Sequence, residues 1–396
     1  MKKSPLVSIF LIIVVDILGL TIILPLLPFY AEKLGASPVM VGILISTYGF
    51  CQLIAGPILG QISDRVGRKP LLLVSQMGTF VGFVLLALSR NLVLVFLARI
   101  IDGLTAGNLS VAQAYISDVT DHENRAKSFG IIGIAFGLGF LIGPAISGFL
   151  AQFGYHYPIV AAATLSATSI AATYFLLPST PIHVPTSDET SERKNPFWQI
   201  NWDSFKDPEL APLLWQFLAF IFAFAIFISG FALFAERRLT HGGIFFGPKE
   251  VGYVFAYIGL VGVFIQGVMI GPLVKKFGEA RLVKFGFINM LVGFILLGWV
   301  WNVPILLIAL TIAFLGSSLL RPSLTSLVTK KAGKAQQGMM LGLTQSLTSI
   351  AQIIAPLVSG VLIQHRFLSF WAWVSALSSA VGLWLIERYK FLPSKV

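Results

Sequence analysis

Long apolar stretches alternate with short polar segments along this chain. A transmembrane helix needs roughly 20 predominantly apolar residues, and twelve stretches of the chain meet that requirement. The predicted spans are residues 7–29, 39–62, 71–89, 92–117, 128–151, 158–178, 211–235, 250–272, 282–301, 304–329, 339–363 and 369–387. The first is too long for the apolar region of a signal peptide and lacks a following cleavage site, so we interpret it as a retained helix. The pattern predicts an all-α membrane protein.

Composition agrees with this pattern. Apolar residues make up 56% of the chain and charged residues 11%, and a soluble domain could not cover such a surface with polar groups. The single cysteine, Cys51, excludes an intramolecular disulfide and a cysteine-cluster metal site, and we interpret it as an inert packing residue. The five histidines show no metal-ligand spacing, so no cofactor is expected.

The net charge of +11 could indicate a nucleic-acid partner, but its distribution does not. Of the 28 Lys and Arg residues, 20 fall in the loops on the side of the N-terminus and six in the opposite loops. This is the bias of cytoplasmic loops in membrane proteins. It predicts an inner-membrane protein with both termini in the cytoplasm and no nucleic-acid partner.

A polar stretch divides the twelve spans into two sets of six. The sequence predicts a bundle at residues 1–178, a cytoplasmic linker at 179–210 and a second bundle at 211–396. The second part of the linker either forms a short amphipathic helix at the membrane interface or is disordered. Its aromatic residues are Phe197, Trp198, Trp202 and Phe205.

The two halves are related in sequence at an offset of about 211 residues. GQISDRVG at residues 60–67 aligns with GPLVKKFG at 271–278, and GPAISG at 143–148 aligns with APLVSG at 355–360. Internal duplication is typical of transporters, because two similar bundles can rock about a central site.

The loop after the second span reads GQISDRVGRKP at residues 60–70. It is a tight turn with one acid and three bases beside glycines that allow close backbone approach. This loop resembles the most diagnostic motif of the major facilitator superfamily. The resemblance implies that Asp64 and Arg68 gate the cytoplasmic side, with Asp118 as a third partner; a merely topogenic basic loop is the alternative. The other matching positions are Gly60, Arg65 and Gly67.

The fourth span contains Arg99 and Asp102, three residues apart on one helix face. An arginine inside a span costs roughly 2.5–3.5 kcal/mol and needs a partner or a wet cavity. The stretch resembles the family motif for proton coupling, in which the arginine influences the proton affinity of a nearby acid. A neutral ion pair that only aids folding is the alternative.

The fifth span places small residues four apart, which permits close helix packing. It resembles the antiporter motif of the family, which implies drug–proton exchange, although Ser147 replaces one glycine of the usual pair. Glycine-mediated packing without a link to antiport is the alternative. The matching positions are Gly139, Gly143, Pro144 and Gly148.

The first span places Asp16 among apolar residues. A carboxylate in low dielectric can bind and release a proton in the physiological range; an acid hydrogen-bonded to the backbone is the alternative. This span, and most of the chain, resembles the drug–proton antiporter branch, in particular the tetracycline-efflux group. Residues that handle the metal–tetracycline chelate in that group are nevertheless replaced, so tetracycline is not the predicted substrate. The three positions are Gly82, Gly262 and Met290.

The resemblance implies twelve helices in two six-helix bundles related by pseudo-two-fold symmetry, with a cavity lined by the first, fourth, seventh and tenth helices. Arg321 in the tenth span indicates a carboxylate-bearing substrate or serves to balance Asp16. A stripe of phenylalanines in the seventh span is assigned no site role. The polar residues predicted to line the cavity are Asp16, Gln52, Asn108, Gln113, Gln266 and Arg321.

Together these features predict a monomeric, proton-coupled antiporter that exports an amphipathic organic molecule across a lipid bilayer by alternating access. The alternative within the same fold is a symporter or facilitator for a specific organic anion such as a metabolite or a siderophore. A receptor or an enzyme is the remaining class. No nucleophile–base pair stands out near the membrane surface, so catalysis is not predicted.

Overall fold

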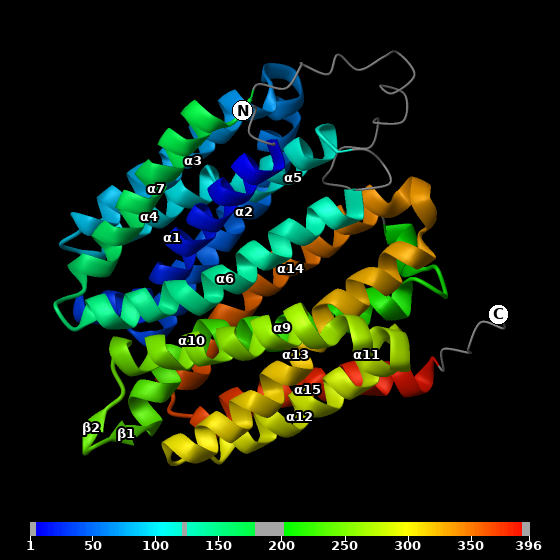
Figure 1. Ribbon diagram of the computed structural model, residues 1–396. Coiled ribbons are helices and arrows are strands. Elements are labelled where there is room, and N and C mark those ends of the chain that lie inside the picture. The colour runs from blue at the N-terminus through cyan, green and yellow to red at the C-terminus, as the bar shows by residue number, and fades with distance from the viewer. Residues whose placement is uncertain (1–4, 121–124, 179–201, 390–396) are drawn as a thin grey trace. The chain divides into compact units, whose positions relative to one another are not determined.

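The computed structural model describes residues 5–120, 125–178 and 202–389 (Figure 1). Within these residues, twelve helical segments are long and apolar enough to span a membrane, as the apolar pattern predicts. The first half contains α1 (Pro5–Lys33), α2 (Pro38–Val66), α3 (Arg68–Ala87), α4 (Leu92–Leu104), α5 (Asn108–Asp118), α6 (Arg125–Ala151) and α7 (His156–Leu176). The second contains α9 (Ala211–Arg238), α10 (Pro248–Phe264), α11 (Ile270–Phe277), α12 (Glu279–Gly298), α13 (Val303–Lys331), α14 (Gly333–Gln364) and α15 (Leu368–Arg388).

Two predicted spans are interrupted. The fourth is broken between α4 and α5 at Thr105–Gly107, where a single helix was expected. The eighth contains a π-helical turn, Ile265–Met269, between α10 and α11. A two-stranded hairpin of β1 (Thr240–His241) and β2 (Ile244–Phe245) precedes α10, and Thr240 pairs with Phe245.

The helices group by their contacts into two compact units. Unit 1 comprises residues 1–36, 44–199 and 248–259, and unit 2 comprises residues 37–43, 200–247 and 260–396. The first turns of α2 therefore group with unit 2, and most of α10 groups with unit 1. The predicted linker limits, 179 and 210, stay predictions.

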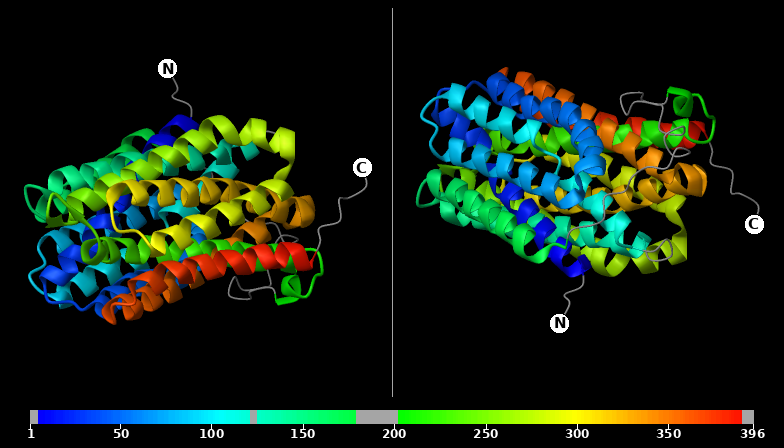
Figure 2. Two further views of the ribbon diagram at one scale, coloured as in Figure 1. Left: turned by 90° about the horizontal axis from the view of Figure 1, so that it is seen from below. Right: turned by 90° about the horizontal axis from the view of Figure 1, so that it is seen from above.

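In each unit a few helices make most of the contacts between helices; Figure 2 shows the ribbon from two further sides. In unit 1, α1 packs against α6 and α7, and α3 packs against α4 and α7. In unit 2, α9 packs against α13, α14 and α15. The phenylalanine stripe of α9 forms this second core, because Phe217, Phe227 and Phe231 are buried, and the rings of the last two stack 4.9 Å apart.

The internal repeat appears as two equivalent helix crossings. In unit 1, a Cβ on Gly252 of α10 would lie 2.6 Å from the carbonyl oxygen of Pro144 in α6. In unit 2, a Cβ on Gly42 of α2 would lie even closer to the carbonyl oxygen of Pro356 in α14. Both glycines and both prolines are related by the offset of about 211 residues found in the sequence, so the duplication extends to helix packing.

The part of the linker that the structure describes forms a short 3₁₀ turn, Trp202–Phe205. The ring of Phe205 lies 5.3 Å from that of Trp215 at the start of α9. Asp207 then accepts hydrogen bonds from the backbone N–H groups of Glu209 and Leu210. Phe197 and Trp198 lie outside the described residues.

Candidate functional site

Asp16 lies near the middle of α1, where two other helices supply polar partners. The amide Nε2 of Gln76 in α3 lies 3.2 Å from one carboxylate oxygen of Asp16 and 3.4 Å from the other. The same nitrogen lies 2.8 Å from the hydroxyl of Ser169 in α7. Among the residues that the structure describes, no Lys, Arg or His pairs with Asp16. Its partners are thus a neutral amide and a neutral hydroxyl from neighbouring helices.

Sequence reasoning missed both partners of Asp16. Gln76 and Ser169 are fully buried, and buried polar side chains are retained only with hydrogen bonds. A signal was present in α7, the sixth predicted span, where Ser166, Ser169 and Thr173 recur at helical spacing and are all buried. The Oε1 atom of Gln76 has no hydrogen-bond partner within the described part of the chain. The amide therefore has one unused acceptor.

Arg99 and Asp102 form a buried ion pair in α4, as predicted from their spacing. The guanidinium Nη1 lies 3.2 Å from the carboxylate of Asp102, and each residue is 3% exposed. The rings of Phe83 and Tyr48 flank the guanidinium at 5.8 Å and 5.9 Å. Two other guanidinium nitrogens, Nε and Nη2, lack partners among the described residues. The ion pair is therefore buried, and two hydrogen-bonding nitrogens of Arg99 lack partners among the described residues.

Gly82 explains how α3 approaches this ion pair. A Cβ at that position would lie 3.0 Å from the Cβ of Asp102 and 3.1 Å from the carbonyl oxygen of Ala98. A larger side chain on α3 would therefore displace the acid carried by α4. The carboxylate near this crossing therefore comes from α4, and α3 contributes only its backbone.

The break after α4 is held by a side chain of α3. The hydroxyl of Ser75 donates to the carbonyl oxygen of Thr105 and accepts from the backbone N–H of Gly107 at 3.0 Å. A Cβ on Gly107 would lie 2.8 Å from Leu59. The backbone groups released by the break are thereby satisfied inside the protein, as membrane interiors require.

Arg68 bridges two acids at the junction of α2 and α3. Its Nη1 lies 2.5 Å from Asp64 and its Nε lies 2.8 Å from Asp118 at the end of α5. The hydroxyl of Ser63 also accepts from Nη1 at 2.5 Å. Gly67 turns the chain with φ of 95°, a conformation that favours glycine. Three helix ends are thus tied to one guanidinium, while Arg65 is exposed.

The antiporter-like stretch of α6 has two packing faces. Gly139 and Gly143 lie directly against Ile17 and Thr21 of α1, one turn from Asp16, and Thr21 donates to the carbonyl oxygen of Gly139 at 2.9 Å. On the other face, a Cβ on Gly148 would lie 2.8 Å from the carbonyl oxygen of Lys249. Gly60 has open space around it, so the structure gives that glycine no packing role.

The remaining cavity candidates divide between the two units. Gln52, Asn108 and Gln113 of unit 1 are half-buried, and the Oδ1 atom of Asn108 lacks a partner among the described residues. Gln266 and Arg321 of unit 2 are exposed. Within the described residues, no group of three His, Cys, Asp or Glu side chains could hold a metal ion.

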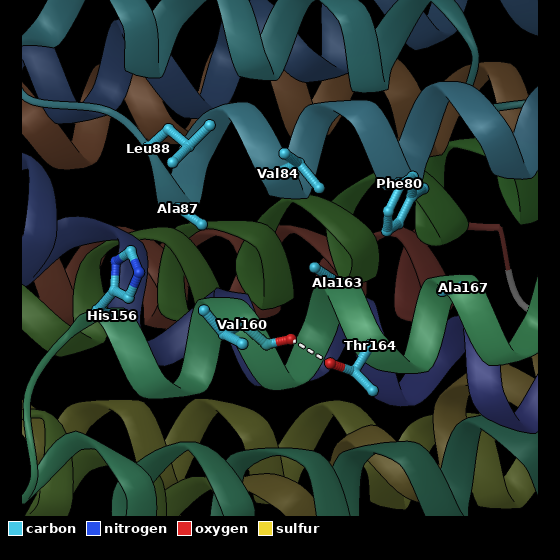
Figure 3. A pocket seen from close by; sticks show the side chains of 9 residues that line it. All are labelled: Phe80, Val84, Ala87, Leu88, His156, Val160, Ala163, Thr164 and Ala167. Atoms are coloured by element: carbon cyan, nitrogen blue, oxygen red, sulfur yellow. Dashed lines mark hydrogen bonds between the residues drawn. The ribbon is translucent and has the colours of Figure 1, made fainter.

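An apolar groove of about 350 Å³ lies between α3 and α7 (Figure 3). Phe80 and Val84 line one side, and Val160 and Thr164 line the other. Thr164 is exposed whereas Ser169 is buried, so the groove lies on a different face of α7 from the Asp16 cluster. Thr164 donates to the backbone of its own helix at 2.9 Å. His156 is the other polar residue of the lining, and the remaining lining residues are apolar.

Comparisons with known proteins agree with this architecture. The sequence model described as Major Facilitator Superfamily matches residues 9–356 and again 245–395. The class E tetracycline resistance protein of Escherichia coli is 31% identical over 97% of this chain and 94% of that protein. Multidrug resistance protein 2 of Bacillus subtilis (strain 168) is 28% identical over 88% of this chain and 86% of that protein.

A solved structure shares the fold. The crystal structure of the human organic anion transporter MFSD10 (TETRAN) aligns with a TM-score of 0.69 and 23% identity, covering 96% of this chain and 99% of that chain. The sequence match extends along most of the chain, and twelve helices long enough to span a membrane accompany it. This chain is therefore a multi-pass membrane protein of the Major Facilitator Superfamily, related to tetracycline and multidrug resistance proteins.

Proposed function

We propose that this protein is a proton-coupled antiporter of the inner membrane that exports amphipathic organic molecules, with Asp16 as the proton carrier. The observation that carries the proposal is an acid in the middle of a spanning helix whose described partners are all uncharged. An ionised carboxylate without a counter-charge is costly in low dielectric. Proton binding removes that charge, so the proton occupancy of Asp16 can select between two conformations of the protein.

The α1–α6 contact supports a link between protonation and helix movement. Gly139 and Gly143 hold α6 against α1 within one turn of Asp16. A change in the charge of Asp16 acts on the helix interface that this pair of glycines keeps close. In the proposed cycle a proton enters Asp16 from outside and leaves to the cytoplasm, while the ion pair of Arg99 and Asp102 tunes the electrostatic field in the same unit.

The gate proposal rests on Arg68. By bridging Asp64 and Asp118, it ties together the ends of α2, α3 and α5. In this proposal both termini and the α2–α3 junction lie in the cytoplasm, as the distribution of basic residues predicts. Breaking the bridge opens that end of unit 1, and re-forming it closes the end again. The transporter acts as a monomer and carries out no catalysis.

The substrate is proposed to differ from the metal–tetracycline chelate, although relatives that are 31% and 32% identical to this chain are tetracycline resistance proteins. Gly82 lies so close to Asp102 that no acidic side chain fits at that position without displacement. Met290 is fully buried and offers no charged ligand. Export rather than import is supported by the names of the relatives, which are resistance proteins. Counterflow under an imposed pH gradient distinguishes the two directions.

Flux measurements in proteoliposomes test the proposal. Wild-type protein should accumulate ethidium or 1-naphthaleneacetate when a pH gradient is imposed. Asp16→Asn keeps the size of the side chain but cannot carry a proton, so it should lower gradient-driven flux to the level of empty liposomes.

The matched control is Glu209→Gln, which neutralises an exposed acid that pairs with Lys331 at 2.9 Å. It should leave flux within twofold of wild type. Gradient-driven flux by Asp16→Asn equal to that of wild type, in protein with an unchanged melting temperature, would rule out Asp16 as the carrier.

A further inference from the structure

Arg321 is a charged residue far from the ends of a spanning helix of unit 2. It lies ten residues before the end of α13, whereas the other charged residues of the described unit 2 helices lie within six residues of a helix end. Its side chain is exposed, and its described contact is the ring of Phe224 in α9, 6.0 Å from the guanidinium carbon. Among the described residues no carboxylate pairs with it. Ionisable side chains inside membrane spans are costly and rare, which indicates a functional role.

Arg321 points toward the helices of its own unit and away from lipid. At 3.6 residues per turn it lies about 20° around α13 from Phe314 and about 140° from Ile308. Phe314 packs against Phe224 and Phe227 of α9 at 6.0 Å and 5.0 Å. Ile308 is 57% exposed, as expected for a lipid-facing residue. The guanidinium therefore lies on the α9 side of the helix.

A second polar group, Gln266, lies in the π-helical turn that follows α10. Gly262 faces Ser318, since a Cβ there would lie 3.7 Å from the serine hydroxyl. Gln266 follows Gly262 by four residues, and Arg321 follows Ser318 by three. Gln266 is exposed and belongs to the π-helical turn Ile265–Met269, which contacts α13. Such turns occur frequently at functional sites.

We infer that Arg321, Phe224 and Gln266 form a binding site for the carboxylate end of an amphipathic aromatic anion. A guanidinium binds a carboxylate through two parallel hydrogen bonds, and an amide adds a further donor. The half-buried ring of Phe224 offers an apolar face to the body of the ligand. That the bound anion is also the exported cargo rests on the proposed function.

Thermal unfolding of the purified protein in neutral detergent tests the site without any gradient. The probes are 1-naphthaleneacetate and 1-naphthaleneacetamide, which share the ring and differ in charge. The acid should raise the melting temperature of the wild type more than the amide does. Arg321→Gln should weaken binding of the acid at least tenfold and leave binding of the amide unchanged, whereas Arg321→Lys should keep part of the preference because the charge remains.

Two further variants separate the parts of the site. Arg90→Gln removes an exposed arginine between α3 and α4 and should bind both probes as the wild type does. Phe224→Leu should weaken binding of the acid and of the amide equally, because the phenylalanine ring does not distinguish the two probes. If Arg321→Gln does not fold, the comparison of Arg321→Lys with the wild type still reports on guanidinium geometry.

Three results would overturn the inference. The first is equal stabilisation of the wild type by the acid and the amide, which is expected if Arg321 serves only to balance Asp16. The second is a preference for the acid that survives in Arg321→Gln, and the third is stabilisation by the anionic lipid phosphatidylglycerol but not by the acid. Failure of this site leaves proton-driven ethidium flux intact. Failure of Asp16 as carrier leaves equilibrium binding of the acid intact, so the two proposals are tested separately.

Discussion

The ion cluster at the α2–α3 junction has a counterpart of reversed charge in unit 2. At the offset of 211 residues, Asp64 corresponds to Lys275 and Arg68 corresponds to Glu279. Glu279 begins α12 as Arg68 begins α3, and it contacts Lys330 near the end of α13. Arg68 contacts Asp118 at the end of α5 in the same relation. The repeat thus preserves the position of the pairing while exchanging the sign of its charges.

Charge reversal within unit 1 tests whether position or sign matters. Arg68→Glu alone places an acid beside Asp64 and Asp118, so it should cost about 1.5–3 kcal/mol, the usual value of hydrogen bonds to charged groups, and lower flux. Adding Asp64→Lys and Asp118→Lys recreates the polarity of unit 2 and should restore melting temperature and flux.

The control for charge reversal is Arg65→Glu at a neighbouring, exposed position. This variant should change the melting temperature and the flux only slightly. If the triple variant is as defective as Arg68→Glu alone, the sign of the charge is essential and the equivalence of the two clusters is wrong.

At this scale the sequence predicted charged pairs better than neutral ones. Arg99 with Asp102 follows from i, i+3 spacing within one helix, and the structure places them 3.2 Å apart. Gln76 and Ser169 could not be assigned to Asp16, because each comes from a different helix and no local spacing relates them. Contacts between helices depend on rotation about each helix axis, which an apolar pattern leaves loosely defined.

At the scale of helices, both units contain close helix–helix crossings at glycine residues. A Cβ on Gly252 would lie 2.6 Å from the carbonyl oxygen of Pro144 and 2.7 Å from the Cα of Gly148. In unit 2, a Cβ on Gly360 would lie 2.6 Å from the carbonyl oxygen of Pro38. Small residues permit such approaches between membrane helices. The α6–α10 and α2–α14 crossings therefore leave no space for a methyl group.

Gly252→Ala should push α10 away from α6 and destabilise the protein by about 1–3 kcal/mol, as overpacking does. Gly56→Ala is the matched control, because Gly56 also lies within a helix and has open space around its Cα. The control should leave the melting temperature in detergent unchanged or slightly raised. Equal melting temperatures for wild type and Gly252→Ala would show that the crossing is not tightly packed.

Helix number was predictable from the sequence, whereas helix continuity was not. Twelve apolar stretches of sufficient length fix the number of spans. The break between Leu104 and Asn108 depends on Ser75 of another helix, which satisfies the freed groups of Thr105 and Gly107. The π-helical turn Ile265–Met269 likewise lies inside a predicted span, and hydropathy gives no sign of it. Hydropathy alone contains no information about either irregularity.

Over the whole molecule, the duplication predicted from two short sequence matches reappears in packing. Each unit includes one helix segment from the other half of the chain, Ser37–Ile43 in unit 2 and Pro248–Gly259 in unit 1. These segments carry the glycines of the two equivalent crossings. A pair of related bundles that share helix segments in this reciprocal way fits the rocking motion expected of duplicated transporters.

Antiport requires that the proton and the exported molecule oppose each other's binding. By linkage, a ligand that lowers proton affinity must release protons when it binds. Asp102 is paired with Arg99, whereas the described partners of Asp16 are uncharged. Asp16 is therefore the expected source of any released proton.

Proton release on ligand binding is therefore the most direct test of the account. The purified protein is placed in weakly buffered detergent solution with a pH-sensitive dye, and neutralised 1-naphthaleneacetate or ethidium is added to saturation. The wild type should release up to about one proton per bound ligand, and Asp16→Asn should release none while still binding the ligand. Equal proton release by wild type and Asp16→Asn would contradict the central claim that Asp16 carries the proton.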